Sequence, residues 1–483
     1  MRVFDFCFGW VIIYFLLIAE VSAAQMPSNF EAKIDSFVSN LVADAATPGF
    51  TILVSKGKDK VYEKHIGLAN IEHSIPITDS TVFEVGSVSK QFTATAIMLL
   101  VAEGKISLDD DIHLYIPELP KYGETVTIAN LIYHTSGLKD WGAIARLGGW
   151  PRGSRVYENA HALQYIIRQP DLNNKPGDAY VYSNSNYVLL ALIVERVSGQ
   201  TLQRFTSERI FKRLGMLKTR WRTDYTEVIK NRATAYRAKE NVFFAQMPFE
   251  NTYGHAALLT TARDLLIWNN SWRDTAFWGE IMVALRMGRG VLANGDSLNY
   301  AAGVNIGTYK NHKEVSHAGL TAGYRAWLAY YPDLDISVIY VSNNSSISID
   351  AVHKFFLETL YGPERDDRPT AQKSLISVAP NFEDLILNDY VGEYYNEQCN
   401  GTISIIQEND ALYVYRNFSE IGRLTPENKD RFVLPNEVYM FKRGITGQIE
   451  RLFVSLPNAK NVSFKRLRHS TDHLQTRATF LLK

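Results

Sequence analysis

A serine and a lysine three positions apart are the first candidates for chemistry in this chain. Ser87 and Lys90 occur in FEVGSVSKQFTA, where an apolar stretch with helical spacing begins. On a helix, residues i and i+3 share one face, so the lysine amine can reach the serine hydroxyl. The positive field at a helix N-terminus disfavours a protonated lysine and favours a developing anion on the serine. The pair therefore has the residue types of a nucleophile and its base.

The motif alone is weak, because the chain contains two other Ser-x-x-Lys pairs. Ser55 and Lys58 lie at a strand-to-turn junction, and Ser136 and Lys139 lie in a glycine-containing loop before Asp140. Neither pair begins a helix. An N-capping serine followed by a solvated lysine would also give the Ser87 pattern, so its context has to decide.

Two downstream segments supply that context. Tyr-x-Asn occurs at several places, but only Tyr182-Ser-Asn184 follows a Pro-Gly turn and directly precedes a strong helix pattern. His-x-Gly occurs at His65 and again at His317, and His317-Ala-Gly319 leads into a strand. A glycine in a strand allows backbone to approach a substrate closely. We therefore expect Tyr182 to assist proton transfer and the Gly319 strand to bind the substrate.

Taken in order, these three motifs resemble the serine β-lactamase-related family, which includes class C β-lactamases, D,D-peptidases, D-aminopeptidases and carboxylesterases. Four further segments are similar to sequences typical of this family: ISLDDDIHLYIPELP, LIYHTSGL, FKRLGM and LLTTARDLLIW. The resemblance covers residues 37–361, which is most of the chain.

The resemblance implies a role for each motif residue. Ser87 would be the acyl-forming nucleophile and Lys90 the base that takes its proton. Tyr182, as a tyrosinate or a hydrogen-bond relay, would share this work and pass the proton to the leaving group. Asn184 would hold Lys90 and the substrate amide.

The same resemblance places the oxyanion on backbone N–H groups of Ser87 and of Leu320, the residue after Gly319. His317 departs from the Lys-Thr-Gly element of β-lactamases, where lysine supplies a permanent cation. A histidine is largely neutral near pH 7. We therefore expect the D-aminopeptidase and esterase branches of the family, and not efficient β-lactamase action.

The expected function is a secreted serine hydrolase that acts on an amide, a peptide or an ester, with D-amino-acid-containing peptides favoured. Two alternatives remain open: a carboxylesterase with the same machinery, and a catalytically weak penicillin-recognising or cell-wall-binding protein. The expected partner is a small-molecule or peptide substrate, with cell-wall peptides among the candidates. No cofactor and no metal are expected, because no His-x-x-x-His or Cys-x-x-Cys spacing occurs. The oligomeric state stays open.

Several other residues invite a functional interpretation. We interpret His134 in LIYHTSGL as part of a structural turn near the site, and Cys399 in NEQCNGT as a bystander. Trp141, Trp150 and Trp268 are candidates for lining a substrate cleft. The first two lie in the glycine-rich insertion at 140–155, a kind of loop that often carries specificity.

The segment pattern predicts the fold of the main domain. Strand-like runs at 50–57 and 60–70 are followed by helix patterns that end at Gly104 and Gly199, and two strand-like runs at 322–344 flank a Pro-Asp turn. We expect an α/β (α+β) domain in which the first and last segments share one sheet. The resemblance makes this a β-lactamase-like, transpeptidase-type domain with a central antiparallel sheet flanked by helices.

The chain changes character after Tyr361. A charged, proline-containing segment predicts a linker, and the short alternating runs beyond it predict a small antiparallel β-barrel, similar to the lipocalin-like domain of some family members. The expected domains are a signal peptide at 1–24, the hydrolase domain at 25–362, a linker at 363–384, the barrel at 385–470 and a tail at 471–483.

The N-terminal apolar run from Phe6 to Ala19 is shorter than a membrane span and is followed by small residues. It predicts a cleaved signal and a secreted or periplasmic protein with no stable membrane span. Lysine plus arginine and aspartate plus glutamate both total 51. This balance gives no electrostatic reason to expect nucleic acid as a partner.

Overall fold

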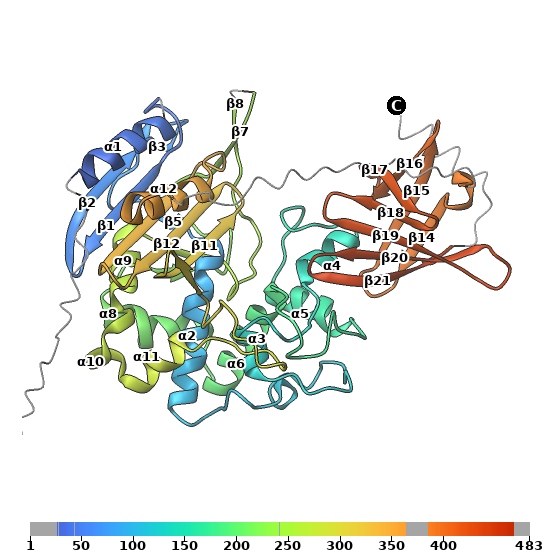
Figure 1. Ribbon diagram of the computed structural model, residues 1–483, viewed down its shortest axis with the longest axis horizontal. Coiled ribbons are helices and arrows are strands. Elements are labelled where there is room, and N and C mark those ends of the chain that lie inside the picture. Colours follow the sequence, from blue (N-terminus) through green and yellow to red (C-terminus); the bar gives the residue numbers. More distant parts are fainter. Residues whose placement is uncertain (1–26, 28, 43, 241, 364–384, 468–483) are drawn as a thin grey trace, which may run out of the picture.

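The computed structural model describes residues 27, 29–42, 44–240, 242–363 and 385–467. The predicted signal peptide, the predicted linker from residue 364 to 384 and the predicted tail lie outside these described residues. The described chain forms a larger α/β body and a smaller β-barrel beside it (Figure 1). Within the described ranges, no helix has the length and apolar character needed to cross a membrane.

A six-stranded antiparallel sheet forms the centre of the larger body. Its first and last strands in the sequence lie next to each other, with Phe50 opposite Ser342 and Lys56 opposite Ile336. This pairing confirms the prediction that the two ends of the domain share one sheet. The strands, in spatial order, are β10 (Asn305–Tyr309), β11 (His312–Thr321), β12 (Tyr324–Tyr331), β13 (Ile336–Ser342), β1 (Phe50–Lys56) and β2 (Asp59–Ile66).

Helices cover both faces of this sheet, and for this reason β13 is buried along its whole length. Helices α1 (Phe30–Leu41) and α12 (Ile349–Tyr361) lie on one face (Figure 1), where Phe37 and Phe355 stack with ring centroids 3.9 Å apart. The other face packs against α2 (Lys90–Ala102) and α9 (Ala262–Asn270). Packing on both faces holds the strands in place and so fixes the positions of the residues that they carry.

Helix α2 begins with Lys90 and is buried from Lys90 to Leu100. It follows the 3-10 turn η1 (Gly86–Ser89) and packs against α6 (Asn184–Ser198), α7 (Leu202–Thr206) and α11 (Glu280–Met287). A helix that is apolar on all sides belongs inside a large domain. The predicted glycine stops are confirmed, since Gly104 and Gly199 both have φ of +68°.

Shorter elements connect this framework. A small sheet of β5 (Phe83–Glu84), β9 (Leu258–Thr260) and β6 (Arg220–Trp221) leads directly into η1, since β5 ends at Glu84. The remaining α-helices and β-strands of this body are α3 (Ile128–Ile132), α4 (Trp141–Leu147), α5 (Asn159–Ile167), α8 (Lys212–Leu214), α10 (Thr275–Trp278), β3 (Leu68–Asn70), β4 (Ile75–Pro76), β7 (Tyr236–Lys239) and β8 (Val242–Ala245).

The C-terminal body is a closed eight-stranded antiparallel barrel, as predicted. Its interior is filled by its own side chains, among them Tyr394, Phe441 and Phe464, which are almost completely buried. The barrel interior is therefore a packed core. Its strands are β14 (Gly392–Asn396), β15 (Gly401–Glu408), β16 (Ala411–Arg416), β17 (Ser419–Asn428), β18 (Arg431–Leu434), β19 (Glu437–Arg443), β20 (Ile449–Leu456) and β21 (Ala459–Arg466).

Helix α4 of the larger body closes one end of this barrel. Ile144 and Leu147 are fully buried and belong to the barrel's hydrophobic core. Arg146 forms an ion pair with Glu437, and the Asp140 N–H donates to the Asn458 carbonyl at 2.9 Å. The two bodies thus share a hydrophobic contact that starts in the insertion at 140–155.

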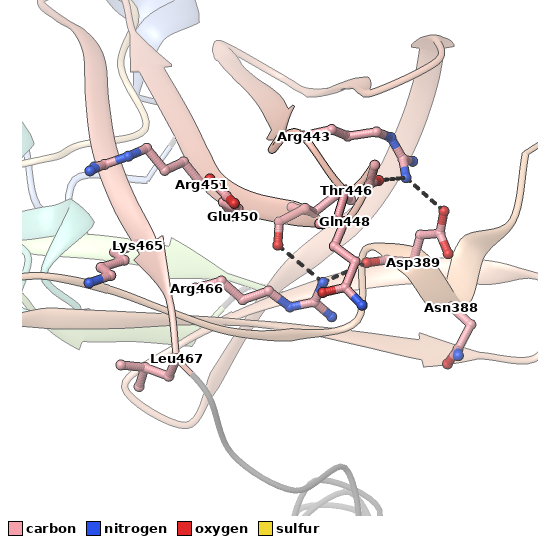
Figure 2. A pocket seen from close by; sticks show the side chains of 12 residues that line it. Asn388, Asp389, Arg443, Thr446, Gln448, Glu450, Arg451, Lys465, Arg466 and Leu467 are labelled. Atoms are coloured by element: carbon pink, nitrogen blue, oxygen red, sulfur yellow. Dashed lines mark hydrogen bonds and ion pairs between the residues drawn. The ribbon is translucent and has the colours of Figure 1, made fainter.

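The opposite end of the barrel carries a cavity of about 760 Å³ (Figure 2). Arg443 pairs there with Asp389, and Arg466 donates to the main-chain carbonyls of Asp389 and Ile449. This cavity is lined only by barrel residues, so it does not adjoin Ser87.

Candidate active site

The predicted nucleophile lies on the turn between β5 and α2. Ser87 belongs to η1 and is half-buried, and Lys90 is the first residue of α2 and is fully buried. The Lys90 Nζ atom lies 3.1 Å from the Ser87 Oγ atom. The turn can form because Gly86 adopts φ of +50°, in the left-handed region that favours glycine.

The hydrogen bonds of Lys90 suit a neutral amine. Its Nζ donates to the Asn184 Oδ1 at 2.9 Å and to the His255 carbonyl at 2.9 Å. A neutral amine has two N–H groups and one lone pair. With both N–H groups used by these two acceptors, the lone pair is left for the Ser87 hydroxyl. The geometry is that of a general base.

The electrostatic surroundings support this protonation state. Burial lowers the pKa of Lys90 well below 10.5, and the positive charge of Arg152 lowers it further, while Asp140 acts in the opposite direction. The desolvated amine is therefore poised to accept a proton.

Tyr182 lies beside the same two residues. The Ser87 side chain interacts with its phenol, and the Lys90 Nζ is 4.8 Å from the centre of its ring. Burial raises the pKa of Tyr182, so the phenol keeps its proton near pH 7. Of the two expected roles, the hydrogen-bond relay fits this environment and the tyrosinate does not.

His134 holds the Tyr182 segment in place. Its Nδ1 accepts from the Ser183 N–H at 3.2 Å and from the Asn186 amide at 3.1 Å, and its ring packs on Tyr182 with centroids 4.2 Å apart. Burial lowers its pKa far below 6.5. His134 is therefore a neutral positioning residue, in agreement with its interpretation as part of a structural turn.

His317 lies on β11 and is also neutral. Its Nδ1–H donates to the Ala318 carbonyl at 2.6 Å, and its Nε2 lies 3.2 Å from the Tyr300 hydroxyl, which can donate to it. Burial lowers the pKa of His317 to about 4. It cannot supply the permanent cation that a lysine would supply at this position.

Strand β11 lies directly against the nucleophile turn. A Cβ atom added to Gly319 would lie 2.0 Å from the Val85 carbonyl oxygen, and one added to Gly86 would lie 2.7 Å from the Leu320 nitrogen. Only glycine fits at these two contacts. The main chain of Leu320 thus lies beside Ser87, while the residue as a whole is 61% exposed.

One edge of β11 is open beside the turn. Strand β10 pairs with residues 312–316 only, and among the described strands none pairs with 317–321 on that side. An extended substrate can add to such an edge through main-chain hydrogen bonds.

The two other Ser-x-x-Lys pairs have structural partners. Ser55 donates to the Asn270 side chain at 3.2 Å, and Ser136 donates to the Asn186 side chain at 2.7 Å. Lys139 forms an ion pair with Asp171. In the described structure neither of these serines is hydrogen-bonded to its lysine, whereas Ser87 is hydrogen-bonded to Lys90. Of the three pairs, Ser87 and Lys90 thus have the geometry that the nucleophile hypothesis requires.

The three tryptophans do not line the site. Trp268 is a core residue that packs on Phe92, and Trp141 is buried between Arg152 and His255. Trp150 faces a different cavity, which it shares with barrel residues. Cys399 is buried and burial raises its pKa to about 12, as expected for a bystander.

Two charged residues of the insertion at 140–155 do reach the site, and the sequence did not single them out. Asp140 caps α4 through Oδ1 and accepts the Asn184 N–H through Oδ2 at 2.6 Å. Arg152 acts on Lys90 by its charge and is paired with Glu250. Asp140 has the sequence signal of an N-cap, but nothing in the sequence connects Arg152 with Ser87.

Comparison with known proteins agrees with this geometry. The family model described as "Beta-lactamase" matches residues 34–354. The chain belongs to the β-lactamase family. The sequence is 27% identical over 409 residues to penicillin-binding protein 4* of Bacillus subtilis, covering 80% of this chain and 87% of that protein. It is 24% identical over 353 residues to a D-aminopeptidase of Gluconobacter oxydans, covering 73% of this chain and 66% of that protein.

Solved structures show the same β-lactamase family fold. The octameric penicillin-binding protein homologue from Pyrococcus abyssi has a TM-score of 0.61 at 25% identity, over 90% of this chain and 99% of that chain. A D-amino acid amidase from Ochrobactrum anthropi has a TM-score of 0.58 at 21% identity, over 69% of this chain and 98% of that chain. The protein is thus a serine hydrolase of the β-lactamase family.

In this member of the family, α4 connects the site to the barrel. Its N-cap, Asp140, holds the Asn184 main chain, and its Trp141 N–H donates to the Ser185 hydroxyl at 2.8 Å. Its other end, at Ile144 and Leu147, fills the barrel core. Displacing the barrel should therefore disturb Asn184 and through it Lys90.

Leu147→Asp tests this connection. We expect the free energy of unfolding to fall by about 3 to 5 kcal/mol, because a carboxylate replaces a buried leucine, and kcat to fall together with it. Denaturant titration and steady-state kinetics measure the two effects. Leu114→Asp is the matched control, because Leu114 is 69% exposed. Full activity of a folded Leu147→Asp protein would show that the barrel does not support the site.

Proposed function

We propose that the protein is a secreted or periplasmic hydrolase that forms an acyl-enzyme on Ser87 and cleaves an amide, a peptide containing a D-amino acid, or an ester. One observation carries this proposal: the buried Lys90 amine, held by Asn184 and His255, lies 3.1 Å from the Ser87 Oγ.

Acylation transfers one proton and forms one bond. As the Ser87 Oγ attacks the carbonyl carbon, its proton moves to Lys90 Nζ, and the carbonyl electrons move to the oxygen. The N–H groups of Ser87 and Leu320 stabilise this oxyanion. The proton then passes through the Tyr182 hydroxyl to the leaving group as the bond to that group breaks. Water repeats the sequence and frees Ser87.

The environment of His317 bears on the substrate class. A neutral imidazole paired with Tyr300 offers no cation for a β-lactam carboxylate, which argues against efficient β-lactamase action. The similarity to a D-aminopeptidase favours D-amino-acid-containing peptides. Because a neutral site also accepts an uncharged ester leaving group, a carboxylesterase with the same machinery is the second candidate.

Labelling with a fluorophosphonate tests the nucleophile. We expect mass spectrometry of the folded protein to find one adduct, on the peptide that contains Ser87, and none in Ser87→Ala.

Hydrolysis of D-alanyl p-nitroanilide and p-nitrophenyl acetate then distinguishes a peptidase from an esterase. The intact mass of protein from a secreting host tests secretion, for which we expect an N-terminus near Gln25. Absence of a Ser87 adduct would favour a cell-wall-binding protein without catalysis.

A further inference from the structure

A cavity of about 430 Å³ lies on β11 beyond the nucleophile. Along this strand, His317 comes first, Gly319 and Leu320 lie beside Ser87, and the cavity follows. It is lined by charged, polar and apolar side chains from three segments, including Arg152, Gln246, Phe249, Glu250, Leu320 and Thr321. The cavity and His317 are therefore on opposite sides of the reacting carbonyl.

Arg152 is the cation of this cavity, and Glu250 fixes it from one side. The Arg152 Nε donates to Glu250 Oε2 at 2.9 Å, and its Nη2 pairs with Glu250 Oε1. Its Nη1 has no partner among the described residues and is not one of the buried unpartnered atoms. Since the side chain is 29% exposed and lines the cavity, Nη1 is the nitrogen available to a ligand.

The ion pair of Arg152 and Glu250 is held in place by a second, buried ion pair. The Glu250 carbonyl accepts from Arg222, and Arg222 donates through Nε to Glu84 Oε2 at 2.9 Å with both side chains buried. Glu84 ends β5, three residues before Ser87. Both Glu250 oxygens are used by Arg152, so the cavity offers hydrogen-bond donors and not a free carboxylate. Such a site suits an anionic oxygen ligand.

The direction of the substrate follows from the proposed mechanism. Tyr182 protonates the leaving group, and its ring packs against Tyr300, which bonds to His317. The leaving group therefore departs on the His317 side. The acyl part extends the other way along β11, past Leu320 to the cavity with Arg152.

We propose that Arg152 Nη1 binds a carboxylate carried by the acyl part of the substrate, so that the enzyme prefers acyl groups with an anionic end. This inference rests on the proposed acyl-enzyme mechanism and names its substrate class. In this arrangement Arg152 recognises a negative charge on the acyl side of the substrate. His317, on the leaving-group side, is neutral and does not.

A matched pair of esters measures the preference. p-Nitrophenyl hexanoate and mono-p-nitrophenyl adipate have the same leaving group and the same six-carbon acyl chain, and only the second ends in a carboxylate. We expect the wild-type kcat/KM to be higher for the adipate. In Arg152→Gln, the ratio of the two kcat/KM values should fall roughly tenfold or more, the size expected for a hydrogen bond to a charged group. Any effect of Arg152 on Lys90 changes kcat/KM for both esters by the same factor, so it does not change their ratio.

Two further variants guard against a folding artefact. Gln246→Glu adds a negative charge to the cavity while leaving Arg152 in place, and the main-chain hydrogen bonds of Gln246 do not depend on its side chain. We expect this variant to lower the ratio of kcat/KM for the adipate ester to kcat/KM for the hexanoate ester by at least roughly threefold. Arg155→Gln is the control, because Arg155 stacks on Trp150 at 4.5 Å and does not line the cavity; its ratio should match that of wild type.

Binding without hydrolysis separates the subsite from the mechanism. Calorimetry of Ser87→Ala with monomethyl adipate should show binding that Arg152→Gln abolishes in the same background. Such binding supports the subsite even if Ser87 labelling fails, in which case only the mechanism is wrong. Equal ester ratios in wild type and Arg152→Gln, or binding that does not depend on Arg152, would overturn the proposal.

Discussion

Lys90→Met should lower kcat/KM by roughly 10³-fold on amide and ester substrates alike, within the range for loss of a general base. Methionine has a similar length and is apolar, so it fits the buried space. It leaves Ser87 without an acceptor for its proton. Steady-state kinetics on both substrates measure the effect, and single-turnover assays should place the loss in acylation.

Lys139→Met is the matched control, since Lys139 is a buried lysine of an unused Ser-x-x-Lys pair. Its activity should stay within about threefold of wild type, because the Lys139 amine bonds to Asp171 and takes no part in the proton transfer from Ser87. If Lys90→Met kept wild-type kcat, Tyr182 or another group would have to be the base.

The pH dependence follows from the direction of the Lys90 pKa shift. Burial lowers the pKa, so the amine is neutral above this lowered value, and activity should fall as the pH falls through it. Protonation of His317 is expected near pH 4. The same shift affects stability: the unfolded chain binds a proton at Lys90 up to about pH 10.5, where the folded chain does not. Wild-type stability should therefore rise with pH in this window, by up to about 1.4 kcal/mol per unit, relative to Lys90→Met.

The sequence could predict the core of the site because each motif has a local signal and the motifs come in a fixed order. Ser87 and Lys90 share one turn and helix start, and Tyr182 and Asn184 lie at the start of another helix. The glycine of the third motif marks the strand that touches the first. Tertiary structure only had to bring three short segments together.

Arg152 and the tryptophans show where sequence reasoning fails. The sequence pattern predicts that Trp141 and Trp150 of the insertion at 140–155 line the substrate cleft. In the structure Trp141 is buried and Trp150 faces the barrel, whereas Arg152 lines the cavity beside Leu320. Which side chain of an irregular loop points to the site depends on distant contacts, here Glu250 and the barrel core. No periodicity in the loop carries that information.

The barrel itself was predicted, but its relation to the hydrolase was not. The sequence pattern left open whether it binds a ligand or covers the active site. In the structure its interior is packed, and α4 fills one end with Ile144 and Leu147. Helix α4 has too few residues for its hydrophobic pattern to show whether it packs in its own domain or against another one.

Gly319→Ala should lower kcat by about 100-fold or more. The added Cβ would lie 2.0 Å from the Val85 carbonyl oxygen and 3.1 Å from the Ser87 nitrogen, so β11 and the nucleophile turn must move apart. Both proposed oxyanion donors, the N–H groups of Ser87 and Leu320, lie on these two segments. A misplacement of about 1 Å can cost roughly 100-fold, and loss of one oxyanion donor costs about 10²- to 10³-fold.

Gly307→Ala distinguishes this effect from a general cost of replacing a strand glycine. Gly307 lies on β10 of the same sheet, and an added Cβ there meets no atom within 4 Å. Its kcat should equal that of wild type. Fluorophosphonate labelling of Gly319→Ala should slow in parallel with kcat, because the reagent also develops charge on an oxygen next to Ser87. Wild-type labelling and turnover in a folded Gly319→Ala protein would exclude the Leu320 main chain from the oxyanion site.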